Sequence, residues 1–298
     1  MNSVKTVLLL GLLSGVVLFA GEALGGRTGL EYGLIIAVAM NFFSYFFSER
    51  LSLMMYRARP VTPQENPEVY ARVYPLVQGL TQRMGLPMPR LWLIPEAQPN
   101  AFATGRNPHH ASVAFTEGIL SLMTDRELEG VVAHELGHVL HRDILISSVA
   151  ATLAAAITFL ARMAGWAAMF GGYERDREDD RGGGSALGGI LMIILAPIAA
   201  MLIQMAISRS REYSADQASA KYTGSPDALI SALGKLERGV ERIPMDDATP
   251  ATAHMFILNP FSGGGLMRLF STHPSTEERI ARLQAMHGDA LRRMPRVH

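Results

Sequence analysis

Four long apolar segments restrict what this chain can fold into. They run over Val4–Ala23, Leu30–Phe47, Ile144–Phe170 and Ala186–Ser208. Each has about 18–27 residues, and a helix that rises 1.5 Å per residue needs about 20 residues to cross a hydrocarbon core of ~30 Å. We therefore predict a mainly α-helical membrane protein with four transmembrane helices in two hairpins. The alternative for the last two segments is a buried helical hairpin, and for the first it is a cleaved signal peptide.

The composition agrees with a membrane protein and excludes some other classes. Apolar residues make up 49% of the 298 residues and charged residues only 18%. The net charge is zero and the basic residues are scattered, so there is no electrostatic case for binding nucleic acid. The chain has no cysteine, which excludes disulfide bonds and thiolate metal sites.

Arginines beside the apolar segments predict the orientation in the membrane. Arg50, Arg57 and Arg59 follow the second segment, whereas Arg209 and Arg211 follow the fourth. Because basic residues are enriched on the cytoplasmic side, both termini and both polar parts of the chain are expected there.

Four parts of the chain follow from this topology. We expect two membrane hairpins that alternate with the two halves of one cytoplasmic catalytic domain: residues 1–47, 48–143, 144–208 and 209–298.

The first polar part has the pattern of an α+β domain with a small sheet. Asn66–Met84 favours a helix that Pro75 would disturb, and alternating apolar residues predict three short strands at Arg90–Ile94, Asn100–Thr104 and Ser112–Phe115. Thr124 and Glu127 form a capping-box pattern, which predicts that a helix begins there.

That helix contains the sequence His134-Glu135-Leu136-Gly137-His138, an H-E-x-x-H motif. Histidines at i and i+4 share one helical face, so both rings can reach the same metal ion, and the neighbouring glutamate can accept a proton from a water that the metal activates. The motif predicts a zinc-dependent hydrolase. An ordinary core helix with a buried histidine is the alternative.

A catalytic zinc usually takes three protein ligands, so the motif needs a partner. His141 is badly placed, because it lies about 10 Å further along a straight helix than His134. Glu212 and Asp216, at i and i+4 beyond the fourth apolar segment, are better candidates. Glu212 can bind the metal while Asp216 accepts a hydrogen bond from a ligand histidine. A solvated charged turn is the alternative for this pair.

The predicted topology is compatible with a shared site. Two spans separate His138 from Glu212, so both lie on the same side of the membrane. No glycine or proline follows His138 before Gly165, and we therefore expect the motif helix to continue into the third span. If both helices continue without a break, the ligands lie ~9 Å above the membrane surface.

These motifs together resemble the HtpX-type membrane zinc endopeptidases of the gluzincin group, to which the CAAX prenyl-protein endopeptidases are more distantly related. The resemblance covers essentially the whole chain. Besides the H-E-L-G-H and E-Y-S-A-D motifs, it includes three further segments: Pro99–Gly105, His254–Pro260 and Thr272–Ile280.

The resemblance implies a role for each metal-site residue. His134, His138 and Glu212 would bind one Zn²⁺, Glu135 would act as general base and acid, and Asp216 would support a ligand histidine.

It also implies how a substrate is bound. The residues Asn100, Ala101, Phe102 and Ala103 would form a sheet edge that accepts the substrate backbone as an added strand. His273 would stabilise the oxyanion. For His273 and Arg279, a helix start with ordinary surface charges is the alternative.

The expected function is that of a membrane-bound zinc endopeptidase in a bacterial-type inner membrane, with a cytoplasmic active site. The resemblance implies substrates among membrane or misfolded proteins, in quality control under stress. A specific processing or prenyl-peptide protease is one alternative, and a membrane scaffold or chaperone with a structural zinc is another.

Overall fold

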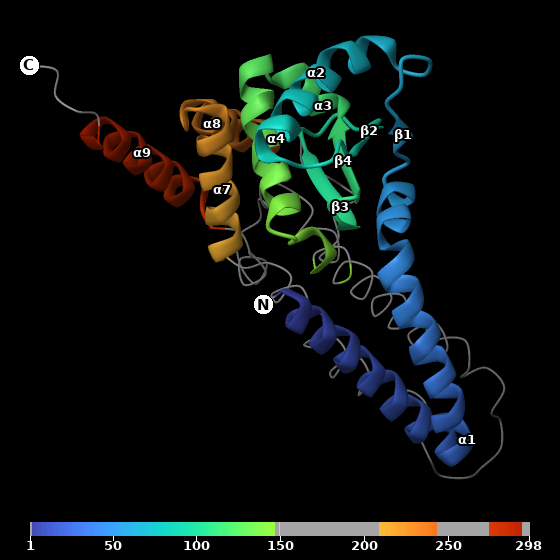
Figure 1. Cartoon of the computed structure of the whole chain (residues 1–298). Coiled ribbons are helices and arrows are strands. Elements are labelled where there is room, and N and C mark those ends of the chain that lie inside the picture. Colours follow the sequence, from blue (N-terminus) through green and yellow to red (C-terminus); the bar gives the residue numbers. More distant parts are fainter. Residues whose placement is uncertain (1, 147–148, 150–208, 243–273, 294–298) are drawn as a thin grey trace, which may run out of the picture.

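The chain begins with a helical hairpin, α1 (Asn2–Met55), that projects away from the α+β part (Figure 1). The computed structural model describes residues 2–146, 149, 209–242 and 274–293. Gly26 breaks the helix with a left-handed φ of 56°, a conformation that glycine adopts at little cost. The two arms are in contact, and the Asn41 side chain of one donates a hydrogen bond to Ser14 Oγ of the other at 2.8 Å.

The arms of α1 agree with the first two apolar segments predicted from the sequence. Within the described residues, Gly26–Phe47 is the one helix long and apolar enough to cross a membrane. Nearly all of the predicted spans at 144–170 and 186–208 lies outside the described residues. The chain is thus mostly helical with a small mixed sheet, and four transmembrane helices remain a prediction.

The sheet has four strands in the order β1-β2-β4-β3. Strands β2 and β4 are parallel, whereas the pairs β1–β2 and β3–β4 are antiparallel. The three predicted strands are confirmed, and β3 and β4 are longer than predicted because they pair with each other as far as their connecting turn. The strands are β1 (Arg59–Pro60), β2 (Arg90–Ile94), β3 (Ala101–Asn107) and β4 (His110–Thr116).

Each face of the sheet is covered by helices, and side chains alternate between the two faces. Val113 and Phe115 of β4 are fully buried in a core formed with α2 (Pro67–Met84) and α4 (Asp125–Leu140). On the other face, Phe102 and Ala114 pack with Leu53 near the end of α1. Burying a side chain such as Phe102 or Leu53 contributes about 1.5–3 kcal/mol, so these contacts hold the end of α1 to the sheet.

Helix α2 runs through Pro75 without ending there, contrary to the expected disturbance. Proline removes one backbone N–H and leaves the carbonyl of Ala71 without its helical donor. Both residues lie on the exposed side of the helix, where water can replace the missing hydrogen bond.

The capping box at the start of α4 is confirmed. Thr124 Oγ1 accepts a hydrogen bond from the Glu127 amide, and Glu127 Oε2 accepts one from the Thr124 amide at 2.9 Å. Glu127 also accepts hydrogen bonds from Ser231 Oγ at 2.6 Å and from Lys235 Nζ at 2.7 Å. Although burial raises the pKa of this carboxyl, these donors outweigh it and lower the pKa to about 2. The cap therefore ties α4 to α8 (Asp227–Arg242).

The expected continuation of the motif helix into a membrane span is wrong. Helix α4 ends at Leu140, and Arg142 adopts a left-handed φ of 58° before a new helical turn begins at Ile144. The Asp143 amide donates to the His138 carbonyl and the Arg142 amide to the Val139 carbonyl, a Schellman-type end without its usual glycine. The chain therefore changes direction between the metal-binding motif and the predicted third span.

Helices α7 (Arg209–Thr223) and α8 pack closely on α4 because two glycines leave room for them. A Cβ atom on Gly137 would lie 3.1 Å from Ala215 Cα, and one on Gly130 would lie 2.8 Å from the Leu229 amide nitrogen. The Ser219 hydroxyl also donates to the Gly130 carbonyl at 2.7 Å. Figure 1 shows α7 beside α4, and this contact determines the position of the metal centre.

Two further helices complete the described part of the chain. Helix α3 (Glu117–Leu122) leads from β4 to α4, and α9 (Thr276–Arg293) packs against α7 and α8.

Candidate metal centre

His134 and His138 lie on the face of α4 that meets α7. Their ring centroids are 4.9 Å apart and the rings are nearly perpendicular, at 89°. His134 is almost fully buried, whereas 17% of the His138 side chain is exposed. The two rings thus sit one helical turn apart, as the sequence spacing predicts.

Glu212 of α7 faces both rings. Its carboxylate oxygens lie 3.7 Å from His134 Nε2 and 3.6 Å from His138 Nε2. Donor atoms about 2.1 Å from one tetrahedral zinc ion are about 3.4 Å apart. The three side chains therefore fit one ion, and their donor atoms all lie within 4.8 Å of one another.

Carboxylates hold the other nitrogen of each ring. Asp216 Oδ1 lies 2.9 Å from His134 Nδ1, and Asp143 Oδ2 lies 3.4 Å from His138 Nδ1. A carboxylate that accepts the Nδ1 proton fixes the tautomer and leaves the Nε2 lone pair for a metal. Both Nε2 atoms point toward Glu212, so the two histidines have the same arrangement.

Asp216 is in turn held by Arg279 of α9. The guanidinium donates to Asp216 twice, from Nη2 at 2.6 Å and from Nε at 3.0 Å. Arg279 is completely buried, so the surface-charge alternative is wrong for this residue. Burial raises the pKa of Asp216, but Arg279 and His134 outweigh it and lower the pKa to about 2. Asp216 is therefore a carboxylate at neutral pH.

Asp143 is a site residue that sequence reasoning missed. It is nearly fully buried and reaches His138 only because the chain turns back after Leu140. Burial lowers the pKa of His138, but the carboxylates of Asp143 and Glu212 and, further, that of Glu135 outweigh it and raise the pKa to about 9. A site that stabilises a protonated imidazole so strongly is also suited to a divalent cation. The sequence signal that could have identified Asp143 is its position, five residues after the second histidine of the motif.

Glu135 lies between the metal-binding rings and the edge of the sheet. The residue is 6% exposed, and its carboxylate accepts a hydrogen bond from the Ala103 amide of β3 at 2.9 Å. Burial raises its pKa above the ordinary value despite the opposing effect of His134 and His138. A raised pKa suits a group that must both accept and donate a proton.

The structure brings together most of the site residues that the sequence predicts. Asn100, Ala101, Phe102 and Ala103 lie at or next to β3, the outermost strand of the described sheet opposite β1. Ala103 reaches Glu135 directly, whereas the Phe102 side chain points to the opposite face and packs on Tyr56. His273 lies outside the described residues.

Two imidazoles and a carboxylate around one point, with a second glutamate beside the first histidine, define a metallopeptidase of the H-E-x-x-H class. Comparison with known proteins narrows this class. The chain belongs to peptidase family M48, whose model matches residues 63–287.

Two similar proteins are described as protease HtpX homologs. A protease HtpX homolog of Desulfatibacillum aliphaticivorans is 55% identical over 95% of this chain and 89% of its own length. Another, from Syntrophotalea carbinolica, is 52% identical over 96% of this chain and 99% of its own length. Among solved structures, S. mikatae Ste24p matches with a TM-score of 0.47 and 19% identity, covering 95% of this chain and 65% of that chain.

The family match and the two HtpX homologues confirm the HtpX-type resemblance. The protein is a membrane-associated metalloprotease, a hydrolase of peptide bonds. They also argue against the alternative of a scaffold with a purely structural metal.

Proposed function

We propose that this protein is a zinc endopeptidase that binds one Zn²⁺ through His134, His138 and Glu212. The observation that carries this proposal is the convergence of these three side chains from two helices that are far apart in the sequence. Glu135 lies beside them, and burial raises the pKa of its carboxyl group. When bound, zinc would act as a Lewis acid that acidifies water and polarises a carbonyl group.

Glu135 would carry the proton during hydrolysis. Its carboxylate would accept a proton from the attacking water and then donate it to the amine that leaves. The hydrogen bond from the Ala103 amide would hold the carboxylate in position for both transfers. Asp216, with Arg279 behind it, would keep the His134 ring oriented toward the metal.

The stretch Asn100–Ala103 would bind the substrate backbone as an added strand. Among the described residues, strand β3 pairs with β4 alone, and the Ala103 amide is directed away from β4, toward Glu135. A peptide laid along this edge would pass beside the general base and the metal ligands. His273, six residues before the buried Arg279, would stabilise the oxyanion of the transition state.

The substrates would be cytoplasm-exposed parts of membrane or misfolded proteins, in quality control under stress, at the bacterial inner membrane. The similarity to HtpX homologues supports this assignment, as does the membrane hairpin that packs directly on the catalytic domain. The active site and both termini would face the cytoplasm.

The direct test is cleavage of casein and of a model membrane protein by the purified full chain, with and without zinc. Glu135→Gln should keep stoichiometric zinc but lose proteolysis. His134→Ala and Glu212→Ala should lose both, as measured by elemental analysis and by gel assay. Glu129→Gln is the matched control, because Glu129 is on the same helix and pairs with Arg83 at the surface.

Two results would contradict the assignments. Cleavage by zinc-loaded Glu135→Gln protein would remove Glu135 from the mechanism, and stoichiometric zinc in Glu212→Ala protein would remove Glu212 from the ligand set. Cleavage of many unfolded segments would support quality control, whereas cleavage at one defined terminus would favour a specific processing protease.

The role of the β3 edge has its own test. Peptide substrates methylated at single backbone nitrogens lose one strand hydrogen bond at a time without changing any side chain. If the substrate binds as an added strand, KM should rise at alternate positions, because only every second amide faces the edge. A KM that is indifferent to the position of methylation would argue against strand addition.

A further inference from the structure

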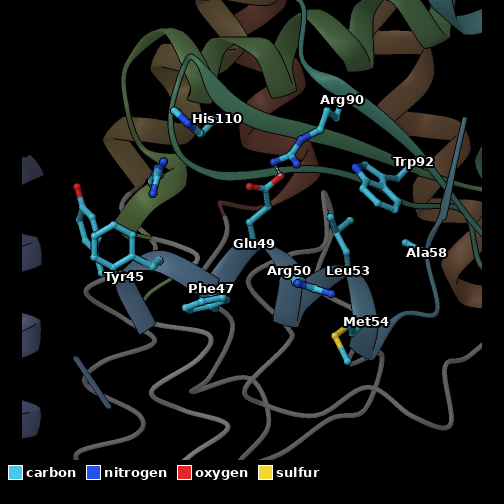
Figure 2. A pocket seen from close by; sticks show the side chains of 12 residues that line it. Tyr45, Phe47, Glu49, Arg50, Leu53, Met54, Ala58, Arg90, Trp92 and His110 are labelled. Carbon is cyan, nitrogen blue, oxygen red and sulfur yellow. Dashed lines mark hydrogen bonds and ion pairs between the residues drawn. The ribbon is translucent and has the colours of Figure 1, made fainter. Parts of the chain in front are cut away.

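A cavity lies between the end of α1 and the sheet, away from the metal centre. None of the metal-site residues lines it. Its volume is about 530 Å³, within the range of ligand-binding pockets. Figure 2 shows side chains of α1 on one side of this cavity and side chains of the sheet, such as Arg90 and Trp92, on the other. We refer to it as the boundary pocket.

The boundary pocket is positively charged. Three arginines and one glutamate line it, and with histidine counted as neutral their formal charges sum to +2. Glu49 pairs with Arg90 at 2.6 Å, as the dashed line in Figure 2 marks, and also accepts a hydrogen bond from Ser112. Within the described parts of the chain, Arg50 and Arg106 form no ion pair. They are available for an anion.

The pocket lies where the predicted membrane span ends. The span Gly26–Phe47 leads directly into the α1 residues that line the pocket. Phe42 and Phe43, one turn before, are more than half exposed, and Phe47 of the pocket itself is 41% exposed. Such an aromatic, apolar surface is costly in water and suits the acyl-chain side of a membrane interface.

The wall of the pocket that the sheet forms combines aromatic and polar groups, as residues at the headgroup level of a membrane do. Trp92 Nε1 donates to Ser112 Oγ at 3.0 Å while its ring packs beside Leu53. The Arg106 guanidinium lies 5.4 Å from the centroid of the Phe46 ring, so an apolar ring and a charged group meet at the same point. A soluble anion would use the arginines but would leave the aromatic surface in water.

We propose that the boundary pocket binds the phosphate headgroup of an anionic phospholipid. Arg50 and Arg106 contact the phosphate oxygens, for which guanidinium groups are geometrically suited. The acyl chains lie along the aromatic face of α1 formed by Phe42, Phe43 and Phe47. The proposal requires the α1 hairpin to lie in the membrane, but it is independent of the metal centre and of the catalytic mechanism. Basic pockets on the cytoplasmic side of membrane helices bind acidic headgroups in the same way.

The test measures which lipids stay on the full-length protein. Wild type and variants are reconstituted in bilayers of equal amounts of phosphatidylglycerol and phosphatidylcholine, transferred to mild detergent, and examined by native mass spectrometry. The wild type should retain phosphatidylglycerol over phosphatidylcholine by roughly tenfold or more. The double variant Arg50→Gln/Arg106→Gln should retain both lipids equally.

Two matched variants control for charge and folding. Arg27→Gln removes an arginine from the exposed turn of the same hairpin, where its side chain is 96% exposed, and should behave as the wild type. Arg50→Lys/Arg106→Lys keeps the charge and should keep most of the preference. If the double glutamine variant does not fold, the single variants Arg50→Gln and Arg106→Gln replace it, and each should lose part of the preference.

Three outcomes would overturn the proposal. The first is a wild-type protein that retains both lipids equally. The second is an undiminished preference in the folded glutamine variant. The third is displacement of the retained lipid by inorganic phosphate at the potency of short-chain phosphatidylglycerol, which would mean that the pocket recognises a free anion. If the phospholipid stays bound to the wild-type protein when inorganic phosphate is added, the result supports a lipid ligand.

Discussion

The close approach of α7 to α4 at Gly137 makes a sharp prediction about the metal centre. Gly137 lies within the H-E-x-x-H motif but has no side chain to bind a metal. It leaves room for α7, which carries Glu212 and Asp216. In Gly137→Ala, the added Cβ atom would lie 3.1 Å from both Ala215 Cα and Ala218 Cβ. The substitution therefore acts on zinc only through the distance between the two helices.

The size of the effect follows from these distances. Ordinary contacts of a Cβ atom begin at 3.4 Å, so α7 must retreat by a few tenths of an ångström. Zinc–ligand distances tolerate shifts of only about 0.2 Å, and Glu212 lies one helical turn from Ala215. Overpacking of this kind costs about 1–3 kcal/mol, which corresponds to zinc binding weakened by about 5- to 150-fold.

Zinc affinity measured by competition with a chromogenic chelator tests this prediction, with thermal unfolding measured in parallel. Gly79→Ala is the matched control, because a Cβ there meets only Arg83 Nη1, at 3.7 Å. Since alanine favours a helix over glycine by about 1 kcal/mol, the control should be slightly stabilised and bind zinc normally. Wild-type zinc affinity in folded Gly137→Ala protein would refute the argument that helix spacing controls the site.

Three other consequences can be measured. Arg142→Gly should raise the free energy of unfolding by up to about 1 kcal/mol, because glycine adopts the left-handed conformation at the end of α4 without strain; a loss in chemical denaturation would contradict this. The Glu127 pKa is lowered from 4.5 to about 2, so its ionised form stabilises the fold above pH 4.5, and this contribution fades as the pH falls toward 2. Glu127→Gln should therefore cost on the order of 3 kcal/mol at neutral pH, with the difference from wild type closing in acid; a difference independent of pH would exclude the carboxylate as its cause. A chelator should lower the unfolding temperature of the wild type, since metal at a hundredfold its Kd stabilises by about 2.7 kcal/mol, and should leave Glu212→Ala unchanged.

Much of the site was predictable because its signals are local. The i, i+4 spacing of His134 and His138 places both rings on one face of any helix, whatever surrounds it. The capping box at Thr124 depends on four consecutive residues, and it forms as predicted. The strand at Arg90–Ile94 follows from its own alternation of side chains. In each case the interacting groups lie within one or two turns of the chain.

The failures share a different cause. The end of α4 lacks a glycine or proline, and the turn there is stabilised by backbone hydrogen bonds around Arg142 and by the carboxylate of Asp143 reaching His138. The sequence left open whether Arg279 is an ordinary surface charge, and the structure shows it buried against Asp216, a residue 63 positions earlier in the chain. The energy of such contacts depends on neighbours that no local pattern specifies.

The amino-acid sequence alone determined the chemistry of this protein: the metal-binding motif, the apolar segments and a distant Glu212 and Asp216 with the spacing of a helix face. Only the tertiary structure decided which of these groups meet. Gly137 and Gly130 admit α7 and α8 to within backbone contact of α4, and this packing brings Glu212 to the two histidines. Asp143, just after α4, and Arg279, in α9, then orient the two histidine rings. Ligand geometry has to be accurate to a few tenths of an ångström, and only the packing of whole helices provides that accuracy.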